Sequence, residues 1–293
     1  MFFLEAMPRY PYDWFFRVGF HYPAVLGFGL LAAFLYGSCL GSFMNVCIWR
    51  IPRGESVAGA PSHCTSCGAE IRWFDNLPVV SYLVLRGRCR RCHAPYSPRY
   101  CIVEAVTGLL FAGILVKTGL TQQVPAVMIP YCAMVLYAIA AGWIDAEHRF
   151  IPDLLSYPAL VVGLVSAGVF PEIWGESVWY RGLLSAGLAA ALAGGGLALF
   201  ALAGKLLFRR EVLGWGDVKY LAATAVLLGL PGALWTLFAG SLFGSVAGTL
   251  CALKRRRSLR RASIPFAPFL GAAALVWIYA GDALLRVFLL AVK

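Results

Sequence analysis

Residues 124–153 read VPAVMIPYCAMVLYAIAAGWIDAEHRFIPD, an apolar run that ends at Asp145 and is followed by a polar turn. About twenty apolar residues are enough for a helix to cross a bilayer. The rest of the chain has the same character, since 60% of its 293 residues are hydrophobic and only 13% are charged. Soluble domains contain about 45–50% apolar and about 25% charged residues, so this excess cannot be buried in one soluble core. The sequence therefore predicts an all-α polytopic membrane protein.

Eight apolar segments of about this length occur along the chain. The predicted spans are 23–48, 101–118, 124–144, 154–170, 182–204, 218–235, 237–253 and 266–290. The boundary between the sixth and seventh spans rests on a turn around Pro231 and Gly232. Residues 1–22 lack a continuous apolar run, so we expect the first span, rather than a cleavable signal peptide, to direct insertion. The predicted parts are an N-terminal segment (1–22), a first helix (23–48), a loop domain (49–100) and a seven-helix domain (101–293).

The positive charge of the chain is concentrated in alternate loops. The net charge is +11, and most basic side chains lie in the loop domain and in the loops after the fifth and seventh spans. Because loops rich in Lys and Arg stay in the cytoplasm, this pattern predicts an inner-membrane protein with residues 1–22 in the periplasm and 49–100 in the cytoplasm. Topology and contact with anionic membrane lipids explain the charge, so we expect no nucleic-acid partner.

The loop domain contains two Cys-x-x-Cys pairs, Cys64 with Cys67 and Cys89 with Cys92. Two such pairs can present four thiolates in the tetrahedral arrangement that zinc prefers. Two disulfides are the alternative, but disulfides seldom persist in the reducing cytoplasm. The loop has few apolar residues and would gain stability from a metal. We therefore expect one structural Zn²⁺, with no open coordination position for catalysis.

The remaining cysteines and the neighbouring histidines have simpler expected roles. His63 and His93 each adjoin a cysteine and are alternative ligands, although we expect them to lie in solvent or beside the metal ligands. The other cysteines lie in or beside the spans and are expected to pack against neighbouring helices: Cys39, Cys47, Cys101, Cys132 and Cys251.

Two aspartates fall at the same predicted membrane face. Asp145 ends the third span, which runs inward, and Asp217 begins the sixth, which runs outward and starts with Gly214-Trp215-Gly216. Ionisable groups inside spans are costly and are functional candidates by default. Two carboxyl groups about 3 Å apart cannot both be ionised. One would then act as general base on water, while the protonated one polarises a scissile carbonyl and donates a proton. Such a pair can activate water and hydrolyse a peptide bond.

Other roles for these acids are open at this point. Each aspartate alone could cap a helix or pair with a nearby cation, Arg149 or Lys219. An ion-coupled transporter could use the same acids, although such sites are expected near the bilayer midplane. Pro152 disfavours a helical residue before it, so Asp153 is expected to open the fourth span as an N-terminal cap.

Several short motifs occur in the order typical of one known family. In chain order they are Gly41-Ser42-Phe43-Met44-Asn45-Val46, the two cysteine pairs, Arg99-Tyr100, Asp145, Ile151-Pro152-Asp153, Gly214-Trp215-Gly216-Asp217 and Ile264-Pro265-Phe266-Ala267-Pro268. The chain thus resembles the type IV prepilin peptidases, or prepilin leader peptidase/N-methyltransferases, which belong to the GxGD membrane aspartyl proteases. One departure is Cys101, at a position where the family usually has proline.

The resemblance implies that Asp145 and Asp217 are the catalytic aspartates. It implies that the partners are precursors of type IV pilins and type II secretion pseudopilins, whose short basic leader is cut after a glycine at the cytoplasmic face. Many members of the family then methylate the new N-terminal amine with S-adenosylmethionine. Since the chain shows no glycine-rich nucleotide loop, methyl transfer rests on the resemblance, and we hypothesise that the loop domain helps to form the methyl-donor site. A protease for general membrane substrates is the alternative.

Overall fold

The computed structural model describes residues 23–59, 62–121, 125–209, 213–255 and 264–291. The N-terminal segment 1–22, with its predicted periplasmic position, lies outside the described residues. Within the described ranges the regular structure consists of α-helices and short 3₁₀ helices, and strand pairing is limited to isolated bridges. The predicted all-α class is therefore confirmed.

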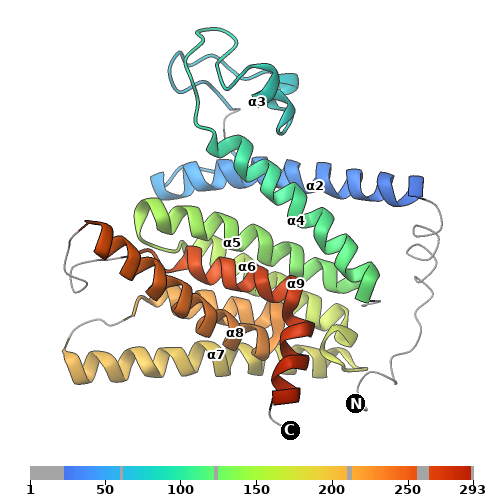
Figure 1. The fold of residues 1–293 in the computed structure, drawn as a ribbon, viewed down its shortest axis with the longest axis vertical. Helices are drawn as coiled ribbons and strands as arrows, with labels where there is room; N and C mark the ends of the chain where they lie inside the picture. The colour runs from blue at the N-terminus through green and yellow to red at the C-terminus, as the bar shows by residue number, and fades with distance from the viewer. Residues whose placement is uncertain (1–22, 60–61, 122–124, 210–212, 256–263, 292–293) are drawn as a thin grey trace.

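Long helices build most of the described chain (Figure 1). Their bounds are α2 (Pro23–Arg50), α4 (Arg99–Thr121), α5 (Met128–His148), α6 (Asp153–Val169), α7 (Trp179–Phe208), α8 (Trp215–Arg255) and α9 (Ala267–Ala291). Six of them are long and apolar enough to cross a membrane, and α6 is a shorter apolar helix. Many of their large apolar side chains are exposed, for example Leu188, Leu192 and Leu199 on α7. The chain is thus a membrane protein whose helices face lipid.

Helix α8 contains both the sixth and the seventh predicted spans. It is broken at Gly229, whose φ of 77° and ψ of 166° are accessible to glycine alone. Beyond the break, Trp235 donates a hydrogen bond to the Ala273 carbonyl, and Gly240 lies against Leu270, so this limb runs antiparallel to α9. The chain therefore reverses at Gly229, just before the turn predicted around Pro231.

Helix α5 lies at the centre of the bundle and contacts α2, α4, α6, α8 and α9 (Figure 1). Its buried face includes Ala138, Ala140, Ala141 and Gly142, small residues that let neighbouring helices approach closely. Because α5 is surrounded, a side chain at its end can meet groups from several other helices. Asp145 lies at that end.

Helices α2 and α4 form a tightly packed pair (Figure 1). A Cβ at Gly37 would lie 2.8 Å from the Phe111 side chain, and one at Gly108 would lie 2.3 Å from Ser38 Oγ. Either side chain would collide with the partner helix, so glycine at these positions permits the close contact.

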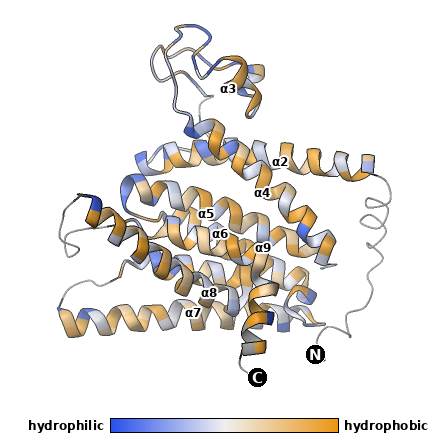
Figure 2. Cartoon of the chain, viewed as in Figure 1, coloured by the Kyte–Doolittle hydropathy of each residue, from blue (hydrophilic) through white to orange (hydrophobic). Residues whose placement is uncertain are grey.

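The segment between α2 and α4 projects beyond the helix bundle (Figure 1). Figure 2 shows hydrophilic residues here and at helix ends, while the helix shafts are mainly hydrophobic. The regular elements of this segment are η1 (Ile51–Arg53), η2 (Trp73–Asn76) and α3 (Val80–Val84). Two polar contacts secure the base of the segment. Asn45 Nδ2 donates to the Tyr100 carbonyl at 3.0 Å, and the Val79 N–H donates to Glu104 Oε2 at 2.8 Å.

Candidate functional site

Asp145 lies on the last turn of α5 and is buried. Its Oδ2 accepts a hydrogen bond of 2.9 Å from the N–H of Ala267, the first residue of α9, and Phe266 supplies a second backbone hydrogen bond. The first N–H groups of a helix lack partners within it and favour an anion. The N-terminus of α9 therefore holds the Asp145 carboxylate in place.

Asp217 lies in the first turn of α8 and is half-buried. Its N–H donates to the Gly214 carbonyl at 3.2 Å, and Gly214 returns a backbone hydrogen bond to the Asp217 carboxylate. Asp217 and Asp145 are close enough to interact electrostatically. The structure thus brings the two predicted catalytic residues to the same end of the bundle, each against the start of a helix.

Contacts around α6 hold the part of α8 that precedes Gly229 beside α5. Lys219 Nζ lies 2.6 Å from Asp153 Oδ1, and the rings of Tyr137 and Tyr220 stack at 4.7 Å. The Tyr137 hydroxyl is also 2.9 Å from Ser156 Oγ. These pairs join elements that are distant in the sequence, and reasoning from the sequence did not find them.

The interpretation of Asp153 as a helix cap is wrong in part. Helix α6 does begin at Asp153, but its N-cap is Pro152, which makes no side-chain hydrogen bond. The Asp153 carboxylate instead pairs with Lys219, because the start of α8 lies beside the start of α6. Lys219 is therefore engaged with Asp153.

Gly216 sets the distance between the Asp217 turn and the loop after α5. A Cβ at Gly216 would lie 3.1 Å from Ile151 Cβ, whereas a Cβ at Gly195 on α7 would meet nothing within 4 Å. We expect Gly216→Ala to shift Asp217 and to lower the rate of peptide cleavage about tenfold, since small misplacements of catalytic groups are costly. Gly195→Ala should leave the rate unchanged. Equal rates for the two variants, measured in one detergent, would show that the Gly216 contact is not needed.

The four loop cysteines come together as predicted. Their Sγ atoms all lie within 4.8 Å of one another, and Cys64 Sγ is 3.8 Å from Cys92 Sγ. A tetrahedral site with Zn–S bonds of about 2.3 Å places its sulfurs about 3.8 Å apart. The four thiols therefore fit a tetrahedral metal ion. All nine cysteines lie in the described ranges and none forms a disulfide, so the two-disulfide alternative is not the arrangement seen.

Two equivalent turns carry the cysteine pairs. In the first, the Cys64 N–H donates to the Ala69 carbonyl and Gly68 has a φ of 67°; in the second, the Cys89 N–H donates to the Ala94 carbonyl and His93 has a φ of 58°. His93 thus shapes the second turn, a role that the sequence reasoning did not foresee. Backbone N–H groups of Cys67 and Ser66 point at Cys64 and lower the pKa of its thiol to about 6.

The other cysteines follow the packing expectation only in part. Cys47 is buried in a cluster with Met44 and Ile48, and Cys132 packs against the central core. Cys39 and Cys251 are exposed on their helices, because those faces of α2 and α8 point away from the bundle.

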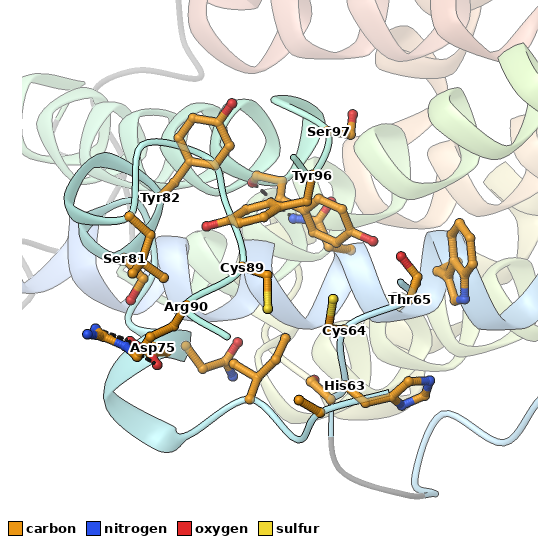
Figure 3. A pocket seen from close by; sticks show the side chains of 18 of the residues that line it. His63, Cys64, Thr65, Asp75, Ser81, Tyr82, Cys89, Arg90, Tyr96 and Ser97 are labelled. Atoms are coloured by element: carbon orange, nitrogen blue, oxygen red, sulfur yellow. Dashed lines mark hydrogen bonds and ion pairs between the residues drawn. The ribbon is translucent and has the colours of Figure 1, made fainter. Parts of the chain in front are cut away.

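A cleft of about 1400 Å³ lies between the loop segment and helices α2 and α4 (Figure 3). Cys64 and Cys89 face one another on its wall, and Arg90 pairs with Asp75 at 2.6 Å. The Arg90 hydrogen bonds hold the pKa of the Asp75 carboxyl below its usual range. Tyr82 and Tyr96 also line the cleft, with ring centroids 5.2 Å apart. No sequence pattern indicated this cleft.

Arg99 connects the cleft to the aspartate site. It lines the cleft at the start of α4, and its Nη1 donates to Glu147 Oε1 at 2.8 Å. Glu147 is two residues beyond Asp145 on α5. The start of α4, where the loop segment ends, is thus tied to the helix that carries one of the two aspartates.

Comparison with known proteins identifies the family. Residues 35–118 match the bacterial peptidase A24 N-terminal domain, and residues 132–249 match the type IV leader peptidase family. The chain is 33% identical over 231 residues to a prepilin leader peptidase/N-methyltransferase of Myxococcus xanthus, covering 78% of this chain and 65% of that relative. It is 31% identical over 289 residues to the enzyme of the same name from Pseudomonas aeruginosa, covering 89% and 93%.

A third relative carries a different name. The type 4 prepilin-like proteins leader peptide-processing enzyme of Escherichia coli is 32% identical over 279 residues, covering 88% of this chain and 95% of the relative. No solved structure matches the chain. The two family matches together extend over most of the helical bundle and the loop segment, and the relatives are matched over nearly their full length in two of the three cases. This chain belongs to the type IV leader peptidase family.

Proposed function

We propose that this chain is a membrane aspartyl endopeptidase that removes the leader peptides of type IV prepilins and type II secretion pseudopilins. We further propose that it then methylates the new N-terminal amine with S-adenosylmethionine. The observation that carries the peptidase activity is the placement of Asp145 and Asp217 at one end of the bundle, each against a helix start. The names of the relatives support prepilins as substrates and methyl transfer as the second activity.

The aspartate pair would act by activating water. The pair shares one proton, so the ionised carboxylate takes a proton from water as the oxygen attacks the scissile carbonyl carbon. The protonated carboxyl donates a hydrogen bond to the carbonyl oxygen. Collapse of the tetrahedral intermediate then breaks the C–N bond, and the pair returns a proton to the leaving amine. The helix starts at Ala267 and Trp215 stabilise the negative charge that remains on the pair.

The proposed topology places this site at the cytoplasmic face of the inner membrane. Support comes from the helix directions, because Asp145 ends α5 while Asp217 and Ala267 begin α8 and α9. The Arg-rich loop segment leaves α2 and enters α4 at Arg50 and Arg99. Loops rich in Lys and Arg stay in the cytoplasm, where the basic leader of a prepilin would also lie. Membrane lipids then surround the helices.

We assign one structural Zn²⁺ to Cys64, Cys67, Cys89 and Cys92. The spacing of the sulfurs supports this ion, because it matches a tetrahedral thiolate site. With four protein ligands the ion would have no open position, so it would serve to stabilise the loop segment and the walls of the cleft. The cleft between that segment and α2 and α4 supports the hypothesis that the methyl donor binds there.

The residue before the cut provides a test of substrate choice. The purified chain should cleave a prepilin whose basic leader ends in glycine, and replacement of that glycine by leucine should abolish cleavage, because a carbonyl must fit closely between the two aspartates. Gel mobility and N-terminal sequencing would report both substrates. Equal cleavage of the two precursors would argue for a protease of general membrane substrates.

A further inference from the structure

Just beneath the floor of the cleft lie polar atoms that no group in the described chain satisfies. Asn45 is only 2% exposed, and its Oδ1 has no hydrogen-bond partner, although its Nδ2 donates to Tyr100. The Arg99 side chain is 10% exposed, and its Nε is likewise buried without a partner. Both residues line the cleft. Buried polar groups are normally hydrogen-bonded, and each of these two atoms has less than 1 Å² of accessible surface, so a ligand in the cleft would satisfy them once the two side chains turn toward it.

A buried carboxylate lies at the same floor. Glu104 lines the cleft and accepts hydrogen bonds from the Val79 N–H and the Ser42 hydroxyl. Neither donor carries a charge, and no ion pair to Glu104 forms among the described residues. A cationic neighbour would stabilise the ionised form of such a buried carboxyl group. Glu104 and Asn45 Oδ1 are therefore suited to a cationic group.

The backbone at Val79 also supports a binding role for Glu104. Its φ of 63° is rare for a β-branched residue and costs free energy, yet its N–H is aimed at Glu104. The strained turn therefore orients the Glu104 carboxylate from the loop side, while Ser42 contacts it from α2. Such strain is retained where the surrounding structure requires one geometry.

Aromatic rings form a path from the loop segment to this floor. Tyr82 and Tyr96 meet edge to face at 5.2 Å, and Tyr96 and Tyr100 do so at 6.2 Å. All three line the cleft. Aromatic faces attract cations and stack with planar heterocycles. The cleft thus offers Arg99 to bind an anionic group, Glu104 and Asn45 to bind a cationic group, and the faces of three tyrosine rings.

We propose that Asn45, Glu104 and Arg99 bind the methionine part of S-adenosylmethionine, an assignment that rests on the proposed methyl transfer. On binding, the Arg99 side chain turns so that its Nε meets the carboxylate of the donor, and the Asn45 amide turns so that its Oδ1, together with Glu104, meets the ammonium group. The tyrosines lie against the sulfonium and the adenine. At about 1400 Å³ the cleft exceeds the roughly 300–1,000 Å³ of a small-molecule site, which leaves room for the N-terminus of a processed pilin.

Direct binding tests this site without measuring activity. Tritiated S-adenosylmethionine would be bound to the zinc-loaded full chain in detergent and measured by equilibrium dialysis. Asn45→Asp and Asn45→Leu both lose the hydrogen bond to Tyr100, but only the aspartate keeps an acceptor. We expect the leucine variant to bind about tenfold more weakly or worse, since hydrogen bonds to charged groups are strong, and the aspartate variant to bind as wild type does.

The test of Arg99 needs one control for the loss of a positive charge and one for the loss of the ion pair with Glu147. Arg99→Leu should weaken binding about tenfold or more, because leucine has no donor at the position of Nε. Arg86→Leu makes the same replacement at an exposed arginine outside the cleft, and Glu147→Gln removes the ion pair but keeps Arg99. Both should bind as wild type does. Equal binding by Arg99→Leu and wild type, or equal weakening in Glu147→Gln, would overturn the site.

The behaviour of the wild type distinguishes a wrongly placed donor site from a failure of the proposed methyl transfer. If the wild type methylates a cleaved pilin and the Asn45 and Arg99 variants still bind the donor normally, the donor site lies elsewhere. If the wild type neither binds the donor nor methylates, the methyltransferase part of the proposed function fails, and this site fails with it.

Discussion

A chain carrying Asp145→Asn or Asp217→Asn should cleave a prepilin about 10³-fold more slowly than wild type. The reason is that an asparagine keeps the size of the side chain but can neither take a proton from water nor return one, and such proton transfers contribute about 10²–10⁴ in rate. The amide oxygen of an asparagine in place of Asp145 can still accept the hydrogen bond from the Ala267 N–H. The fold around it should therefore survive. The measurement is a single-turnover cleavage rate in detergent.

Asp282 provides the matched control for this experiment. It lies on α9, far along the helix from Ala267, and its carboxylate is 3.4 Å from Lys117 Nζ. Asp282→Asn should leave the cleavage rate within about threefold of wild type, as expected for a charge outside the reacting groups. If either Asp145→Asn or Asp217→Asn cleaves as fast as Asp282→Asn, that aspartate is structural and the two-aspartate mechanism is wrong.

Replacing Cys64 by serine should remove the metal and unfold the loop segment. Wild type should contain one zinc ion per chain by inductively coupled plasma mass spectrometry, and Cys64→Ser should contain almost none. Structural zinc contributes about 10–16 kcal/mol in zinc-finger peptides, and this segment has few buried apolar residues to replace it. Hydrogen exchange should then become fast over residues 62–97, while α5 and α9 stay protected.

Cys251→Ser is the control, because Cys251 is exposed on α8 and outside the four-thiol cluster. This variant should keep its zinc and its protection from hydrogen exchange. A Cys64→Ser chain with full zinc occupancy would contradict the four-cysteine assignment. A wild type that is purified without metal and shows a protected loop would contradict a structural role for zinc.

The helices were predictable because their signal is local. An apolar run of about twenty residues defines a spanning segment regardless of its neighbours, so α2, α4, α5, α7 and α9 begin and end within a few residues of the predicted bounds. The reversal in α8 was placed at Pro231 and Gly232, whereas the break is at Gly229. Any of the neighbouring glycines could host such a turn, and packing against α9 decides which one does.

The cysteine cluster was predictable for a similar reason. The spacing within each pair fixes two short turns, and four thiols in one loop have few other ways to be satisfied. What the spacing could not show is that His93 adopts the left-handed conformation that Gly68 adopts in the first turn. Asparagine, aspartate and histidine are the side chains that tolerate this region best.

Contacts between distant helices were not predictable from the sequence. The Ala267 N–H on Asp145, the Lys219–Asp153 pair and the Arg99–Glu147 pair join residues whose proximity depends on how whole helices pack. Composition and periodicity carry no information on that packing. The unpaired atoms of Asn45 and Arg99 are likewise visible only in the folded chain.

Intact-mass spectrometry of a prepilin treated with the purified chain decides whether this protein processes pilin precursors. Without S-adenosylmethionine, the product should be the mature pilin that begins directly after the glycine of the leader. With the methyl donor present, the same product should be heavier by one methyl group, located on its N-terminal amine by fragmentation. An unchanged precursor, or cleavage at another bond, would contradict the proposed peptidase, and a correctly cleaved product that stays unmethylated would contradict the proposed methyl transfer.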